Sequence, residues 1–188
     1  MSDEPAIRGP WDQGEFAAAL TAGLALYGEE IFGFLCGLAR SRVEAQDAFS
    51  ATCERIWRAL PEFRWDSSFR GWCYRIARNT FLSEIRRAHR KEEMQISNIA
   101  EVQAAIARVT TTPAHVRDTV KAKFAQIRAE LEPDDLVLLG LRIDRQLPWS
   151  DIARVLAADE LEPTSKDIAA LRKRYERLKE RLRERMAE

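Results

Sequence analysis

The sequence is short of the residues that build metal and redox sites. Its 188 residues include only two histidines and three cysteines, Cys36, Cys53 and Cys73. The cysteines lie too far apart for a zinc knuckle, and their odd number and apolar helical surroundings predict buried, reduced thiols. His89 and His115 are distant from them along the chain, so no metal site is predicted.

The signatures of enzymes and of exported or membrane proteins are also missing. No Ser/His/Asp set, paired-carboxylate signature, glycine-rich phosphate loop or ligand-spaced cluster is visible, so we predict no catalytic residue and no cofactor. The N-terminus lacks a charged-then-apolar signal layout, and no apolar run approaches the ~20 residues of a membrane span. We therefore expect a cytoplasmic protein that is not an enzyme and has no membrane partner.

The chain has no net charge, because 30 basic residues balance 30 acidic ones. Their distribution is uneven, since basic residues outnumber acidic ones over residues 84–91 and again over 166–188. A neutral chain with local basic stripes can still bind nucleic-acid phosphates at those stripes.

Apolar residues recur at spacings of three and four through most of the chain, and no segment alternates as a strand would. The fold class that this predicts is all-α, with two small helical domains joined by a linker at residues 92–112. Residues 1–14, which carry two prolines and two glycines, are expected to form a loose leader. Helices are expected at residues 16 to about 40, 43–60, 69 to about 90, 116–127, 133–141, 148–156 and 164–186.

Local signals support several of these boundaries. Four glycines in the first long helix weaken its intrinsic propensity by ~1 kcal/mol each, so tertiary packing must hold it, and close helix crossing would use such residues. Pro61 ends the second helix, and Pro148 suits the first turn of a later one. Thr164, with Asp167 three residues on, predicts the start of the last helix.

Aromatic residues and arginines concentrate in residues 57–79, which read WRALPEFR and, a few residues later, SSFRGWCYRIARN. Aromatic rings stack on unpaired bases at ~1–3 kcal/mol each, and arginines hold phosphates. Taken alone, Trp57, Trp72 and Ile76 are better explained as core residues, and the arginines as a solvated face. Trp65 lies in a polar loop, where it is harder to bury, and is a candidate contact to a base.

This stretch resembles region 2 of the extracytoplasmic-function (ECF) sigma factors of the sigma-70 family. That region commonly reads WRxLPxF followed by SFRxWLYRIARN, and Cys73 stands here in place of the leucine. The resemblance is long and ungapped and covers roughly residues 20–91. It implies a helical protein that binds core RNA polymerase and promoter DNA.

The resemblance also implies roles for particular segments. The helix at residues 43–60 would dock on the clamp helices of the polymerase β′ subunit, through Glu44, Gln46, Asp47, Ser50 and Glu54. The loop at residues 62–68 would capture a flipped base of the −10 element, and the next helix would hold the melted strands. The residues implied in −10 DNA binding are Phe63, Arg64, Trp65, Ser67, Arg75, Arg78, Asn79, Arg86 and Arg87.

Residues 131–188 have a helix-turn-helix layout, in which a short helix precedes a long, basic, amphipathic one. Beside region 2, this part resembles region 4 of the same family, which reads the −35 element and contacts the polymerase β flap. The side chains expected to face DNA are those of Lys166, Ala169, Ala170, Lys173 and Arg177. The acidic turn at residues 157–163 is longer than usual for this motif, so individual base contacts are not assigned.

The expected polymerase-binding helix departs from its family at two acidic positions, where Gln46 and Ala51 stand. Fewer carboxylates weaken the complementarity to a basic partner. A phosphate would add about −1.5 to −2 charge. We hypothesise that a Ser/Thr kinase activates the protein at Thr52, or failing that at Ser50. The alternatives are that the helix binds with fewer acids, or that an anti-sigma factor provides the control.

Two other classes of protein compete with a sigma factor. A free-standing helix-turn-helix regulator would bind duplex DNA by itself and would not need residues 57–79. A small helical enzyme would need convergent polar residues, which the sequence does not reveal.

Overall fold

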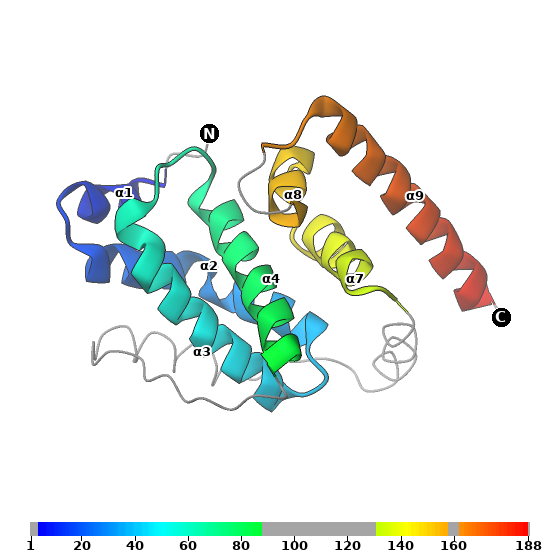
Figure 1. Cartoon of the computed structure of the whole chain (residues 1–188), viewed down its shortest axis with the longest axis horizontal. Coiled ribbons are helices and arrows are strands. Elements are labelled where there is room, and N and C mark those ends of the chain that lie inside the picture. The colour runs from blue at the N-terminus through cyan, green and yellow to red at the C-terminus, as the bar shows by residue number, and fades with distance from the viewer. Residues whose placement is uncertain (1–3, 88–130, 158–161, 188) are drawn as a thin grey trace. The chain divides into compact units, whose positions relative to one another are not determined.

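The computed structural model describes residues 4–87, 131–157 and 162–187. These residues form helices α1 to α4 and α7 to α9, with short 3-10 and π turns (η1 and η2), and no strand occurs among them (Figure 1). They divide into two compact units, one with α1 to α4 and the other with α7 to α9. The predicted all-α fold is confirmed. The linker expected at 92–112 and the helix expected at 116–127 lie outside the described residues.

The N-terminal segment differs from its prediction. Residues Pro5–Asp12 form helix α1, so the expectation of a loose leader is wrong there. Pro5 suits the first turn because its missing N–H would have no partner in any case. Ile7 is fully buried and α1 packs on α2. Eight residues with two prolines are too few to display a helical period, which is why the sequence did not indicate this helix.

Helix α2 (Phe16–Leu38) forms the core of the first unit. The Phe69 side chain at the start of α4 lies so close to Gly23 that a Cβ built on this glycine would be 2.5 Å from the Cε1 atom of the ring. The absence of a side chain at Gly23 therefore makes room for the Phe69 ring, while the close helix crossing expected from the glycines stays a prediction. The largest buried side chains of α2 are Leu20, Leu24, Ile31, Phe32, Phe34 and Leu35.

By length and composition alone, α2 could also cross a membrane, which corrects the prediction that no apolar run is long enough. Half of its apolar stretch is buried inside the unit, where α2 packs on α1, α3 and α4. A core helix meets the same criteria, and burial accounts for the apolar composition here.

Helices α3 (Arg42–Ala59) and α4 (Phe69–Arg87) complete the first unit and are joined by the 3-10 turn η1 (Leu60–Glu62) and a loop. Ser41 caps α3, because its Oγ accepts a hydrogen bond from the Glu44 N–H at 3.1 Å. Trp72 is buried as predicted, whereas Trp57 and Ile76 are partly exposed.

None of the three cysteines forms a disulfide in the structure. Cys53 on α3 and Cys73 on α4 are buried, and burial raises the pKa of both thiols. Cys36, near the end of α2, is partly exposed, so the expectation of burial holds for two of the three.

The second unit consists of α7 (Pro133–Leu139), the π-helical turn η2 (Gly140–Asp144), α8 (Trp149–Leu156) and α9 (Ser165–Ala187). The predicted cap of the last helix is confirmed, because the Thr164 N–H and Oγ1 both donate to Asp167 Oδ2, at 2.8 and 2.7 Å. The π turn was not predicted. The core side chains of this unit are Val137, Leu138, Leu141, Leu147, Ile152, Val155 and Leu178.

Candidate nucleic-acid interface

The loop between η1 and α4 is built on a cluster of aromatic rings. Phe63 stacks on Trp72 with 4.5 Å between ring centroids, and only 6 % of its surface is exposed. Its ring is therefore committed to the protein interior, which corrects the prediction that Phe63 contacts DNA. The exposed loop residues are Arg64 and Asp66, and Ser67 is partly exposed.

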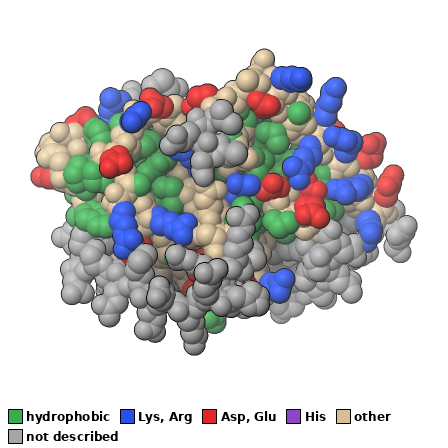
Figure 2. Space-filling view, in the orientation of Figure 1, with side chains coloured by type: hydrophobic (Ala, Val, Ile, Leu, Met, Phe, Trp, Pro, Cys, Tyr) green, Lys and Arg blue, Asp and Glu red, His purple; other side chains and the backbone are tan. Residues whose placement is uncertain are grey.

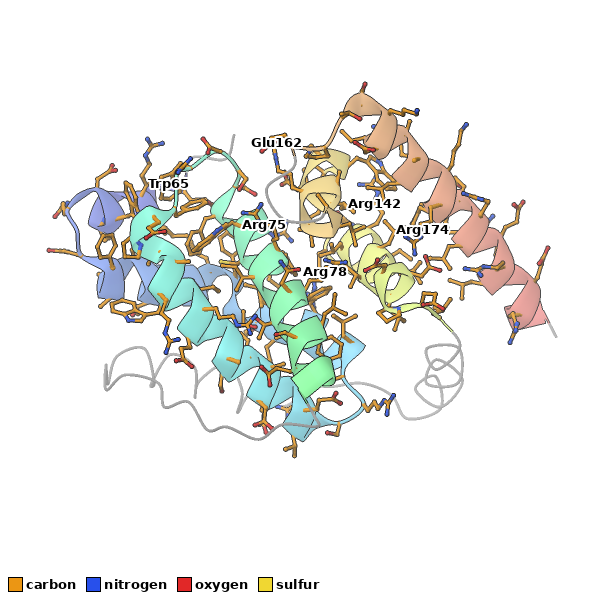
Figure 3. All side chains as sticks on the ribbon, in the orientation of Figure 1. Trp65, Arg75, Arg78, Arg142, Glu162 and Arg174 are labelled. Carbon is orange, nitrogen blue, oxygen red and sulfur yellow. The ribbon has the colours of Figure 1, made fainter. Side chains whose placement is uncertain are left out.

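Trp65 belongs to the same cluster but remains partly exposed (Figure 3). Its ring centroid lies 4.9 Å from that of Phe63 and 5.9 Å from that of Trp11 on α1. The Arg8 guanidinium lies over the indole, 5.4 Å from its centroid. The sequence predicts that this ring is harder to bury; the structure leaves it partly exposed and places two side chains of α1 against it.

The backbone of Trp65 adopts a φ of 58°, in the left-handed region that a bulky side chain rarely occupies. The indole Nε1 is buried and has no hydrogen-bond partner among the described residues. Both features cost free energy, so the packing around Trp65 must hold the loop in this conformation.

The first turn of α4 is capped by a residue far away in the sequence. The carboxylate of Glu4 accepts hydrogen bonds from the backbone N–H groups of Phe69 at 2.8 Å and Arg70 at 3.4 Å. The Tyr27 hydroxyl donates to the same carboxylate at 2.6 Å. Burial, together with this hydrogen bond, raises the pKa of Tyr27. No local pattern signals this contact, because 65 residues separate Glu4 from Phe69.

Arg70 is held in place at the same end of α4. Its Nε and Nη2 atoms donate to the two carboxylate oxygens of Glu30 at 2.6 and 2.9 Å. This bidentate pair joins α4 to α2 and holds Arg70 within the unit.

Two predicted DNA contacts, Arg75 and Arg78, lie three residues apart on α4 (Figure 3). Asn79 follows Arg75 by four residues and so falls on the same helical face. All three side chains are partly exposed, and Arg78 Nη1 donates to Asn79 Oδ1 at 3.2 Å. The structure thus brings these three predicted residues together. Arg86 and Arg87 fall within α4, but their side chains lie outside the described residues.

The predicted polymerase-binding residues on α3 differ in accessibility. Asp47 is exposed, and Gln46 and Ser50 are partly exposed. The Glu44 carboxylate makes a hydrogen bond at the start of its own helix, because its Oε2 accepts from the Arg40 N–H at 2.7 Å. Glu54 is largely buried and paired with Arg58, which corrects the expectation that it faces outward.

Thr52 is not a suitable phosphate acceptor in this conformation. Its side chain is 0 % exposed, and its hydroxyl donates to the Ala48 carbonyl at 2.6 Å. A kinase could not reach it without unfolding α3, and a phosphate would have to enter the core. The order of preference between Thr52 and Ser50 is therefore reversed.

The predicted DNA-facing residues of the second unit all lie on the exposed face of α9: Lys166, Ala169, Ala170, Lys173 and Arg177. The opposite face packs inward through Leu178, which is buried, and Tyr175, which meets Trp149 edge-on at 5.5 Å. Figure 2 shows Lys and Arg side chains along this helix, interspersed with acidic ones.

An ion-pair cluster that the sequence did not reveal fixes α9 on α7. Asp135 is almost buried, and its two oxygens accept from Arg174 at 2.6 Å and Arg181 at 3.0 Å (Figure 3). Arg174 and Arg181 therefore stabilise the packing of α9 on α7, whereas the nearby Lys173 and Arg177 are exposed.

The turn between α8 and α9 also carries an ion pair. Glu162 Oε2 lies 3.2 Å from Arg154 Nε, and Asp151 lies 3.6 Å from the same guanidinium. The acidic turn thus places negative charge beside a basic residue of α8. Residues 158–161 of this turn are outside the described part of the chain.

Comparison with known proteins agrees with this arrangement. A family model described as Sigma-70 region 2 matches residues 25–91, which include most of α2 and all of α3 and α4. The chain is 30 % identical over 136 residues to the RNA polymerase sigma-H factor of Pseudomonas aeruginosa, an alignment that covers 69 % of this chain and 70 % of that protein. No solved structure matches the chain.

Proposed function

Because this chain belongs to the sigma-70 family of RNA polymerase sigma factors, we propose that it is an alternative sigma factor of the ECF type. Sigma factors are not catalysts, and they act with RNA polymerase on promoter DNA. The observation that supports the proposal best is the match to region 2 on α2 to α4, where a loop rich in aromatic residues is followed by a helix with partly exposed arginines. The protein would act in the cytoplasm.

We propose a separate role for each part of the chain. Residues 15–91 would form the polymerase-binding and −10 unit, residues 92–112 the linker, and residues 113–188 the −35 unit. The exposed side of α3, with Gln46, Asp47 and Ser50, would dock on the β′ clamp helices. The second unit would meet the β flap.

Promoter reading would use two surfaces. In the first unit, Arg64, Trp65 and Ser67 would meet the flipped base, while Arg75, Arg78 and Asn79 would hold the melted strand, with Arg86 and Arg87 further along α4. In the second unit, the exposed face of α9 would enter the major groove, where side chains near the start of a helix reach base edges and later basic ones reach phosphates.

Reconstituted transcription tests the proposal. The purified full-length chain and core polymerase would be incubated with promoters mapped by sequencing transcripts after overexpression. We expect co-purification with core polymerase and a run-off product that depends on both proteins. Binding to duplex DNA as a symmetric dimer, without polymerase and without a promoter-dependent product, would instead identify a free-standing helix-turn-helix regulator.

For control of the factor, we propose phosphorylation at Ser50, with an anti-sigma factor as the alternative. Ser50 is partly exposed and lies one turn after Gln46, at the acid-depleted part of α3. Ser50→Glu should raise promoter-specific transcription about two- to fivefold by restoring charge toward a basic partner, and Ser50→Ala should remove any response to the kinase.

Gln46→Glu is the matched control, because it restores an acid one turn away without a phosphorylation site. It should also raise transcription if charge is the cause. Equal activity in wild type, Ser50→Ala and Ser50→Glu, together with no phosphate on Ser50 by mass spectrometry, would leave the anti-sigma factor as the remaining mode of control.

A further inference from the structure

We propose that Glu4 and the helix that follows it, α1, position the −10 reading loop, and that Glu4 and Trp11 are positioning residues for base capture. This inference rests on the proposed function. Residues 4–12 lie outside the segment matched by the region 2 family model, which begins at residue 25. They nevertheless contact both ends of the loop and the ring at its centre.

The first contact is at the start of α4, where the loop ends. The first N–H groups of a helix have no partner within the helix, and the positive end of the helix dipole favours an anion there. Ser68 is the local cap, and its Oγ accepts the Gly71 N–H at 3.0 Å. Glu4 receives the N–H groups of Phe69 and Arg70, so the local cap and the distant carboxylate divide the first turn between them.

The second contact is at the other end of the loop. The Trp11 indole Nε1 donates to the carbonyl of Leu60, the first residue of η1, at 2.7 Å, and the loop follows this turn. The Glu4 and Trp11 contacts therefore fix the entry to the loop at residue 60 and its exit at residue 69. Together they set the span over which residues 63–68 must run.

The third contact is with Trp65 itself. Trp11 meets the Trp65 ring edge-on, and Arg8 lies over the same ring. Trp65 has a left-handed backbone and a buried indole N–H without a partner in the described part of the chain, so this conformation is not favoured by the loop alone. Because α1 supplies two of the side chains that surround Trp65, we infer that it holds the ring where the loop receives a base.

The test must separate positioning from simple stability. Wild type, Glu4→Gln and Trp11→Phe would each be assayed as full chains with core polymerase on two templates, which differ only at the −10 base that the loop captures. The measured quantity is the ratio of run-off transcription from the two templates. A lower folded fraction reduces both products equally and leaves that ratio unchanged, whereas a misplaced loop reduces the ratio.

We expect the template ratio to fall about tenfold in Glu4→Gln, as one charged hydrogen-bonded cap at this position would give, and by a similar or smaller factor in Trp11→Phe. Trp11→Phe keeps an aromatic ring against Trp65 and loses only the bond to Leu60, so it tests the loop with little change in packing. Glu15→Gln is the matched control, because Glu15 is an exposed carboxylate on the same segment, and its ratio should equal that of wild type.

An unchanged ratio in both variants, whether or not total activity falls, would overturn the inference and leave α1 with a role in stability alone. A wild-type chain that gives no promoter-dependent product would overturn the proposed function as well. The wild-type lane therefore distinguishes the two failures.

Discussion

At the scale of single residues, the structure separates side chains that look alike in the sequence. Arg174, Arg177 and Arg181 belong to one basic helix, yet the first and last bind Asp135 and only the middle one is left on the predicted DNA face. The number of basic residues in α9 therefore exceeds the number of basic side chains that are available to contact DNA.

The Asp135 cluster leads to a stability prediction. Asp135→Asn should destabilise the packing of α7 on α9 by about 2 kcal/mol, because two arginines lose their carboxylate. The value is at the low end for a buried pair, since the Arg174 and Arg181 side chains are 40 % and 63 % exposed and water can replace part of the interaction. Hydrogen exchange of the α7 and α9 amides by mass spectrometry would measure it.

Glu132→Gln is the control for this prediction, because Glu132 is an exposed carboxylate just before α7. Exchange in the first unit should be unaffected by either change. Equal protection of α7 and α9 in wild type and Asp135→Asn would show that the cluster contributes nothing to stability.

At the scale of helices, the start of α9 predicts a dependence on pH. Thr164 donates hydrogen bonds from its side chain and its backbone to Asp167, and they lower the pKa of that carboxyl from its ordinary 3.8. A carboxyl with a lowered folded-state pKa adds stability above its unfolded pKa and loses it as the pH falls through the folded value. Below about pH 4, the first turn of α9 should therefore begin to fray.

This fraying can be followed by hydrogen exchange of the first α9 amides between about pH 5 and pH 2, after correction for intrinsic exchange rates. Asp167→Asn should remove the pH dependence at those amides. Glu180→Gln, an exposed carboxylate in the middle of the same helix, should preserve it. A pH dependence that persists in Asp167→Asn would assign it to another group.

Long helices could be predicted from the sequence because their apolar period repeats over several turns. The bounds of α2, α3 and α9 agree with the predictions to within about two residues, and the Thr164 cap was recognised from spacing alone. Helix α1 was missed because it is short, and the π turn after α7 because no local pattern distinguishes it from α-helix.

The candidate site was predictable in part for a related reason. Periodicity and resemblance placed Arg75, Arg78 and the outer face of α9 on accessible surfaces, which needs only the helical repeat. The capping of α4 by Glu4 depends on a contact between residues that are 65 positions apart. The burial of Thr52 depends on how α3 is rotated about its axis. The spacing of apolar residues in the sequence determines neither of them.

At the scale of the whole molecule, the proposed assignment of −10 reading to one unit and −35 reading to the other predicts that the two can be impaired separately. Lys173→Ala with Arg177→Ala should remove the difference in transcription between templates with and without a −35 element. Arg75→Ala with Arg78→Ala should lower transcription from both templates and leave their ratio intact. Each lost phosphate contact should also lower the slope of log affinity against log salt by about one.

Run-off transcription on the paired templates would measure both effects. Arg183→Ala is the control, since it removes an exposed arginine of α9 beyond the predicted contact face. If the Arg75 and Arg78 changes altered the −35 dependence, or if the α9 changes altered the response to the −10 base, the assignment of one element to each unit would be wrong.

The unequal burial of the three thiols gives the protein a natural attachment point for a probe. Cys53 and Cys73 are enclosed by the core, and their raised pKa values keep them protonated and unreactive near neutral pH, while Cys36 is partly exposed. A maleimide dye should therefore modify Cys36 first in the wild-type chain, and peptide mapping of the labelled protein would check this. Fluorescence could then report on the first unit as it meets polymerase and DNA, with no cysteine added or removed.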